Sequence, residues 1–263
     1  MSSKAHTGKK SYRFLFVRAA VLILAAILFL LLPGHPVRGH DLVADEYISR
    51  YRELENKFPG TFYMSGNREK QKVALSFDDG PSPQHTPEIL DILAEYSVPA
   101  TFFLLGQEAA EHTWLVERIA REGHELGNHS YTHRNFTGLE WSAVEEEIRR
   151  TGQLIDDITG EYPRLVRPPY GGVTIGQLQR FEQSDYKLVN WSVDAGDYEE
   201  ENQPEILLAR IQLQMHPGAI ILLHDGGGDR SSTIRILPEL IEMLQDEGFT
   251  FTTVGELIDS NYY

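Results

Sequence analysis

Histidine and aspartate side chains that could bind a metal ion occur at two places in the chain. His129 and His133 are four residues apart, a spacing that on a helical turn puts both side chains on one face. Asp78 and Asp79 follow an apolar run at 73–77. Two histidines and one carboxylate leave positions open for water and substrate, as in catalytic zinc sites. The alternatives are surface histidines and an ordinary Asp-Gly turn.

Two further clusters could supply acid–base groups. Arg167 precedes two prolines, which stiffen the turn, and a guanidinium directed at a carboxylate would keep that carboxylate ionised. His224 follows the most apolar run, 219–223, and could act as a general acid. Asp197 could orient its ring, as carboxylates commonly orient catalytic imidazoles. A surface arginine and a hydrogen-bonded core histidine are the alternatives.

Short apolar runs precede these clusters and alternate with amphipathic stretches. Helix starts are predicted at Thr86-Pro87 and at Ser142, where Glu145 would complete a capping box. The predicted strands are 73–77, 101–105, 124–126, 165–166, 187–191, 219–223 and 250–253. Helices should end near Gly123, Gly160 and Gly248.

Repeated β–α alternation predicts a parallel sheet covered by helices. Seven strands suit a barrel-like closure, and an open doubly wound sheet is the alternative. In β/α barrels the active site lies at the carboxyl ends of the strands, which is where the polar clusters fall.

Composition limits the choice of ligands and partners. The chain has no cysteine, so any metal must be held by histidine or carboxylate. Zinc is the first expectation, and other divalent ions that bind imidazole and carboxylate, such as cobalt, are the alternative. The net charge is −15, and because residues 1–40 contribute +6, the remainder carries −21. A body this acidic repels nucleic acid, which we exclude as a partner.

The first 71 residues divide into three predicted segments. Residues 1–13 form a basic cytoplasmic tail, and 14–32 are an apolar transmembrane anchor or signal peptide. Residues 33–71 are a juxtamembrane helix and linker, because apolar residues recur at helical spacing between 41 and 57. Positive charge before the apolar segment places the rest of the chain outside the cytoplasm, anchored in the cell membrane or secreted after cleavage.

Taken together, the clusters resemble the five ordered motifs of the NodB-homology domain, the polysaccharide deacetylases of carbohydrate esterase family 4. The corresponding segments are 76–80, 129–133, 167–170, 194–198 and 222–224. The resemblance covers about Val73 to Ile258, and we place the domain at 72–260. It implies an α/β fold, the distorted (β/α)₇ barrel of this family, preceded here by the N-terminal hydrophobic segment.

The resemblance also implies roles for the acidic and basic residues. By position in the motifs, Asp79, His129 and His133 would be the metal ligands. Asp78 would be the general base, and Arg167 would be its partner. Asp78 and Asp79 would therefore differ in function although they are adjacent carboxylates.

Other motif positions would contact the substrate. The backbone N–H of Tyr170 would stabilise the oxyanion, and its side chain would bind substrate. His224 would be the general acid, supported by Asp197. Leu222 would line the acetyl pocket. Tyr198 would form an aromatic wall, at a position where the family usually has tryptophan.

These roles together predict a metal-dependent hydrolase that removes N-acetyl groups from an extracellular or cell-wall polysaccharide, such as peptidoglycan or a chitin-like polymer of N-acetylglucosamine. Activated water, a stabilised oxyanion and a protonated leaving amine are what amide hydrolysis needs. The alternatives are an O-acetyl esterase acting on xylan or another acetylated glycan, and a catalytically silent glycan-binding module. The expected partners are an acetylated polysaccharide and, through the N-terminal segment, the membrane.

Overall fold

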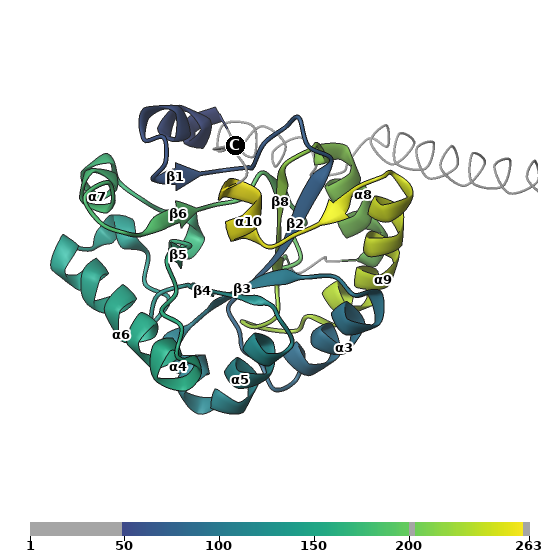
Figure 1. Ribbon diagram of the computed structural model, residues 1–263, viewed down its shortest axis with the longest axis horizontal. Helices are drawn as coiled ribbons and strands as arrows, with labels where there is room; N and C mark the ends of the chain where they lie inside the picture. Colours follow the sequence, from purple (N-terminus) through teal and green to yellow (C-terminus); the bar gives the residue numbers. More distant parts are fainter. Residues whose placement is uncertain (1–48, 200–202, 260–263) are drawn as a thin grey trace, which may run out of the picture. The chain divides into compact units, whose positions relative to one another are not determined.

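The computed structural model describes residues 49–199 and 203–259, and all of these from Arg50 onward belong to one compact unit (Figure 1). The predicted tail at 1–13 and apolar segment at 14–32 lie outside the described residues. Within the described ranges, no helix has the length and apolar character needed to cross a membrane.

A parallel sheet forms the centre of this unit (Figure 1). The order of its strands is β1-β6-β5-β4-β3-β2-β8-β7, and β9 pairs with the start of β2. The four longest strands are β2 (Lys72–Asp78), β3 (Ala100–Leu104), β4 (Glu125–Asn128) and β8 (Ala219–His224). The shorter ones are β1 (Phe62–Tyr63), β5 (Leu165–Val166), β6 (Lys187–Val189), β7 (Val193–Asp194) and β9 (Thr250–Phe251).

The sheet curls into a half-barrel with helices on its outer side, which confirms the predicted fold (Figure 1). All seven predicted strands are present within two residues of their expected bounds. The sequence did not indicate β1 and β7, because a two-residue strand is too short to produce a periodic pattern.

Besides the helix at 49–57, the described residues form eight labelled α-helices, of which seven connect strands and α10 follows the last strand. They are α3 (Thr86–Tyr96), α4 (Gly106–Glu111), α5 (Thr113–Arg121), α6 (Trp141–Thr159), α7 (Ile175–Phe181), α8 (Pro204–Gln214), α9 (Ser231–Asp246) and α10 (Val254–Asp259). The predicted C-terminal glycines are confirmed: Gly160 caps α6 in the left-handed conformation, and Gly123 and Gly248 follow α5 and α9 with positive φ.

Two predicted helix starts were wrong in detail. Thr86 is the first residue of α3 rather than its cap, and its hydroxyl donates to Asp225 and accepts from the Ser82 N–H. Ser142 lies inside α6, so it forms no capping box with Glu145. In both cases a tertiary contact or an earlier helix start overrides the local signal.

Alternation along β2 and β8 separates core side chains from site side chains. Leu75 and Phe77 lie in the hydrophobic core together with residues of α3 and α9. Successive strand residues point to opposite faces, so Asp78 lies on the concave face. In the parallel pairing with β8, it is in register with His224. The sheet therefore brings these two side chains to the same edge although they are far apart in sequence.

The segment before β2 also packs in this unit. Residues 50–57 are helical, and Tyr51 and Leu54 on this helix are buried. The Tyr51 ring lies 5.9 Å from that of Phe62, on β1. Strand β1 in turn pairs with β6 and forms one end of the sheet. This part of the segment predicted as a linker therefore extends the sheet beside β6.

Candidate active site

The carboxyl ends of the strands bring the polar clusters of the sequence together. Asp78 ends β2 and His224 ends β8. His129 follows β4 directly, and Arg167 follows β5 directly. Asp197 lies three residues after β7. Since all these strands are parallel, their ends meet along one rim, as the sequence predicted.

Asp79, His129 and His133 form a cluster that could hold a metal ion. One potential ligand atom from each residue lies within 4.8 Å of the other two. The Asp79 Oδ1 atom is 3.2 Å from His133 Nε2 and 3.5 Å from His129 Nε2. Within the described residues, this is the group of histidines and carboxylates arranged closely enough to share one ion.

The protonation state of His129 suits a metal ligand. Burial lowers the pKa of this imidazole to about 3, so the ring is neutral near pH 7. Its Nδ1 lies 2.7 Å from the carbonyl oxygen of Arg167. Because a carbonyl can only accept, Nδ1 must carry the proton, and Nε2 presents a lone pair toward Asp79.

Asp79 also fits this role. Its Oδ1 atom is buried and accepts no hydrogen bond in the structure. A buried carboxylate oxygen without a partner is costly, and a cation at this position would satisfy it. The side chain is confined as well, since a Cβ atom added at Gly227 would lie 2.6 Å from Asp79 Oδ2. The donor set therefore fits a divalent ion that accepts imidazole and carboxylate ligands.

His129 and His133 reach this position by a loop, and the predicted helical turn was wrong. Ser130 and His133 both have positive φ, at 70° and 59°. The Ser130 N–H donates to Asn128 Oδ1 (3.0 Å), and the His133 N–H donates to Ser130 Oγ (3.0 Å). These side-chain acceptors replace helical hydrogen bonds, so the loop turns back and brings the two histidine rings to 5.1 Å from each other.

Asp78 and Arg167 form a buried ion pair beside the cluster. Arg167 Nη1 donates to Asp78 Oδ1 (2.7 Å) and to Ser76 Oγ (2.9 Å). The guanidinium is fully buried and lies 4.1 Å above the Phe103 ring centroid. Burial raises the pKa of Asp78, and the charge of Arg167 opposes that rise. The predicted pairing of these two residues is therefore present, with Arg167 working against desolvation.

His224 and Asp197 form a second buried pair. Asp197 Oδ1 lies 2.7 Å from His224 Nδ1, and Asp197 Oδ2 accepts from the His224 backbone N–H and from Thr233 Oγ1. Burial alone would lower the pKa of His224, but the nearby carboxylates, Asp197 first and then Asp78 and Asp79, together outweigh it and raise this pKa to about 9. His224 is therefore protonated near neutral pH, with Nδ1 donating to Asp197 and Nε2 also carrying a proton.

Two tyrosines stand beside the histidines. The Tyr170 ring lies 4.6 Å from the His133 ring, and the Tyr198 ring lies 5.5 Å from the His224 ring. Both side chains are about half exposed, so they offer aromatic surface to a ligand. Leu222, two residues before His224 on the same face of β8, is almost fully buried.

Tyr170 has the left-handed conformation, with φ 58° and ψ 17°. Among the described hydrogen bonds, the turn uses the N–H groups of Gly171 and Gly172, which donate to the carbonyls of Pro168 and Pro169.

Asp225 is a buried residue of this rim to which the sequence alone assigned no role. It accepts a hydrogen bond of 2.5 Å from Thr86 Oγ1, and its backbone N–H donates to the Asp78 carbonyl. Burial raises the pKa of the Asp225 carboxyl to about 7. The feature of the sequence that could have indicated this residue is its position directly after His224, at the end of the most apolar strand.

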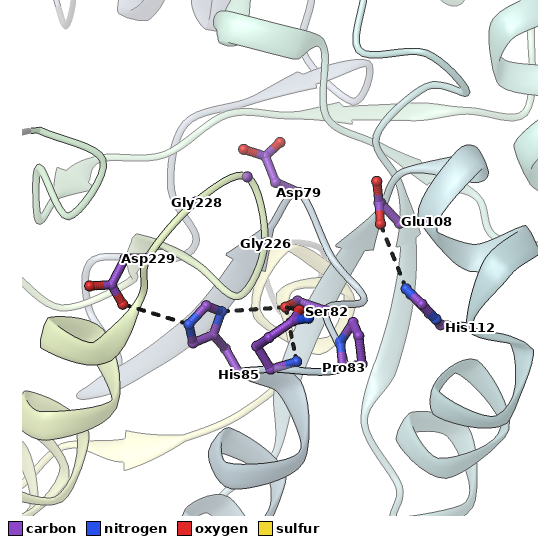
Figure 2. Close-up of a pocket in the computed structure, with 11 residues that line it drawn as sticks. Asp79, Ser82, Pro83, His85, Glu108, His112, Gly226, Gly228 and Asp229 are labelled. Carbon is purple, nitrogen blue, oxygen red and sulfur yellow. Dashed lines mark hydrogen bonds and ion pairs between the residues drawn. The ribbon is translucent and has the colours of Figure 1, made fainter.

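An open cavity of about 570 Å³ extends from Asp79 (Figure 2). Figure 2 shows Glu108 and His112 on one side of Asp79, and His85 and Asp229 on the other. Residues 226–228, three consecutive glycines, also line the cavity. Its polar lining and its position next to Asp79 give space and hydrogen-bonding groups beside the candidate metal site.

The fold and the site define a class of protein: an α/β half-barrel hydrolase whose carboxylate and histidine groups lie at the carboxyl ends of the strands. The family profile described as polysaccharide deacetylase matches residues 55–189. A peptidoglycan-N-acetylglucosamine deacetylase of Bacillus cereus is 34% identical over 201 residues, covering 76% of this chain and 73% of that protein.

Two further comparisons agree. A chitooligosaccharide deacetylase of Bradyrhizobium is 36% identical, covering 74% of this chain and 92% of that protein. The crystal structure of the Bc1960 peptidoglycan N-acetylglucosamine deacetylase superposes with a TM-score of 0.73 at 34% identity, covering 75% of this chain and 92% of that one. The chain belongs to the polysaccharide deacetylase family, carbohydrate esterase family 4, and is an enzyme that deacetylates polysaccharide. The predicted family and class of enzyme are confirmed.

Proposed function

We propose that the protein is a metal-dependent hydrolase that removes N-acetyl groups from N-acetylglucosamine units of an extracytoplasmic polysaccharide. The observation that carries this proposal is the Asp79, His129 and His133 cluster, with the Asp78–Arg167 pair and the His224–Asp197 pair on the same rim. This arrangement supplies a metal-binding group, a carboxylate and a protonated imidazole together.

Each protein group has a definite part in hydrolysis. A divalent ion held by Asp79, His129 and His133 would polarise an acetyl carbonyl and acidify water. Asp78, held by Arg167, accepts the proton of the attacking water. The Tyr170 N–H donates to the oxygen on which negative charge develops.

The second half of the reaction uses the His224–Asp197 pair. His224 donates its Nε2 proton to the departing nitrogen, while Asp197 keeps the ring oriented through Nδ1. The leaving nitrogen of an amide must be protonated before it departs, and His224 carries that proton near neutral pH because its pKa is raised to about 9. This favours an N-acetyl substrate over the O-acetyl groups of xylan, whose leaving oxygen is a better leaving group.

The substrate is proposed to be a polymer because the site is open and extended. Tyr170 and Tyr198 present half-exposed rings beside the two histidines, and sugars stack well on such surfaces. Next to Asp79, the polar cavity offers room for a neighbouring sugar unit. The named activities of the relatives, on peptidoglycan and chitooligosaccharide, point to the same polymers.

The proposed location is outside the cytoplasm, and it rests on the basic residues 1–13 and the apolar segment 14–32. The full-length protein should sediment with membranes if the segment is an anchor, or appear in the medium if it is cleaved. Protection of the domain from added protease in intact spheroplasts, with digestion only after lysis, would contradict this location.

Acetate release tests the reaction. Purified residues 41–263 are incubated with peptidoglycan glycan strands, chitooligosaccharides and acetylated xylan, before and after chelation. We expect release from the N-acetylated glycans, loss of it on chelation, and recovery with Zn²⁺ or Co²⁺. Full activity in a protein shown to contain no metal would contradict the metal, and release from xylan alone would contradict the N-acetyl substrate.

A further inference from the structure

A buried carboxylate outside the sequence motifs contacts the loop that carries the two histidines. Glu147 lies in the middle of α6, and its side chain is only 8% exposed. An isolated ionised carboxylate is costly to bury, so its hydrogen-bond partners indicate what it does. All of the recorded hydrogen bonds of its side chain come from Tyr131 and Thr132.

The carboxylate accepts three hydrogen bonds from this loop. Glu147 Oε2 accepts from the backbone N–H of Tyr131 (2.9 Å) and of Thr132 (2.7 Å). Glu147 Oε1 accepts from Thr132 Oγ1 (2.7 Å). Hydrogen bonds to an ionised acceptor are roughly twice as strong as neutral ones, so three of them fix the loop firmly against α6.

The loop is fixed from its other side by the start of α4. The N–H of Gly106 donates to the Ser130 carbonyl (3.0 Å), and the N–H of Gln107 donates to the Tyr131 carbonyl (3.1 Å). Helix α4 thus binds the carbonyl groups of the loop, whereas Glu147 binds its N–H groups. The loop needs both sets of hydrogen bonds, those from α4 and those to Glu147, because Ser130 has positive φ and the loop has no helical hydrogen bonds of its own.

We infer that Glu147 is a positioning residue, which holds the 130–132 turn so that His129 and His133 converge on Asp79. Tyr131 and Thr132 are the residues between the two histidines, so a shift of their backbone changes the separation of the imidazoles. Partners of this kind in other metal sites contribute to metal affinity although they never touch the ion. The role of Glu147 rests on the proposed metal site.

The test measures zinc affinity in variants of the whole protein by competition with a chelator. Glu147→Ala removes all three acceptors, while Glu147→Gln keeps an amide oxygen for the two N–H groups. Glu146→Ala is the matched control, because Glu146 is the preceding residue of α6, is exposed, and pairs with Arg149.

We expect E147A to bind zinc about 10-fold more weakly, at the low end of the effect of losing a residue that hydrogen-bonds a metal ligand directly, because Glu147 bonds only the residues between the two histidines. E147Q should fall between wild type and E147A, and E146A should match wild type. Activity of E147A should fall most at limiting zinc, with the KM for glycan unchanged, because the recorded hydrogen bonds of the Glu147 side chain reach neither Tyr170 nor Tyr198. Zinc binding by E147A as tight as that of E146A would overturn the role of Glu147, whereas a wild type that binds no zinc would contradict the metal site itself.

A second measurement uses the zinc-free protein and a milder variant. Thr132→Val keeps the side-chain shape but removes the hydroxyl donor, so zinc affinity should fall by less than in E147A. Amide hydrogen exchange at Tyr131 and Thr132 should be faster in zinc-free E147Q than in wild type or E146A. If E147Q shows unchanged amide exchange, and both E147Q and T132V show unchanged zinc affinity, the inference is overturned even if E147A does not fold.

Discussion

Replacing Arg167 by methionine should destabilise the protein as well as inactivate it. Methionine is unbranched and of similar length, but it has no guanidinium to lie over the Phe103 ring and no donor for Asp78. The substitution therefore leaves a carboxylate that is 2% exposed without its counter-ion. It also removes the donors to Ser76 Oγ and to the carbonyl of Val189.

The burial of Asp78 determines how much stability the R167M variant loses. Removing one partner of a buried ion pair costs about 3–5 kcal/mol, because the remaining charge stays desolvated. For a domain of this length, each kcal/mol lowers the melting temperature by roughly 2–4 °C, so we expect a decrease of about 6–20 °C. The double variant R167M/D78N should recover part of the loss, with an interaction energy of about 2 kcal/mol.

The interaction energy is measured by a double-mutant cycle. Thermal or urea unfolding is followed for the wild type, both single variants and the double variant. It should be run with and without chelator, since a bound ion stabilises the folded state through its own affinity. The donors lost to Ser76 and Val189 are not restored in the double variant, so recovery should be partial. The reasoning from burial would be refuted if the effects of R167M and D78N on stability were additive, or if R167M lowered the melting temperature by less than about 2 °C.

Three further predictions, which use four substitutions, test the site. Asp79→Asn should lower metal content and be partly rescued by excess zinc, whereas Asp78→Asn should keep its metal by mass spectrometry and stay inactive; the reverse pattern would exchange the two roles. Turnover should fall as the pH rises through about 9, where His224 loses its proton. Asp197→Asn should move this fall to lower pH. A basic limb of the pH–rate profile that stays in place in this variant would exclude His224 as the acid. Gly227→Ala should weaken zinc binding, because the new Cβ would lie 2.6 Å from Asp79 Oδ2 and the position has φ +72°; zinc affinity equal to wild type would show that the loop yields instead.

The sequence by itself determined the class of fold and most of the candidate site. Apolar runs at regular intervals located seven strands, because burial of each strand within a parallel sheet requires consecutive apolar residues. The polar clusters followed those runs, so a shared rim could be predicted from chain direction alone. Local signals of this kind, such as Gly160 at the end of α6, depend only on neighbouring residues.

Tertiary structure decided the features that depend on residues far apart in the chain. Asp78 and Arg167 are 89 positions apart, and only the order of the strands brings them to 2.7 Å. The same is true of the loop between the histidines, which the sequence predicted as a helical turn. Its N–H groups, which a helix would have bonded internally, are bound in part by the carboxylate of Glu147, 15 residues further along, and its carbonyls by the start of α4.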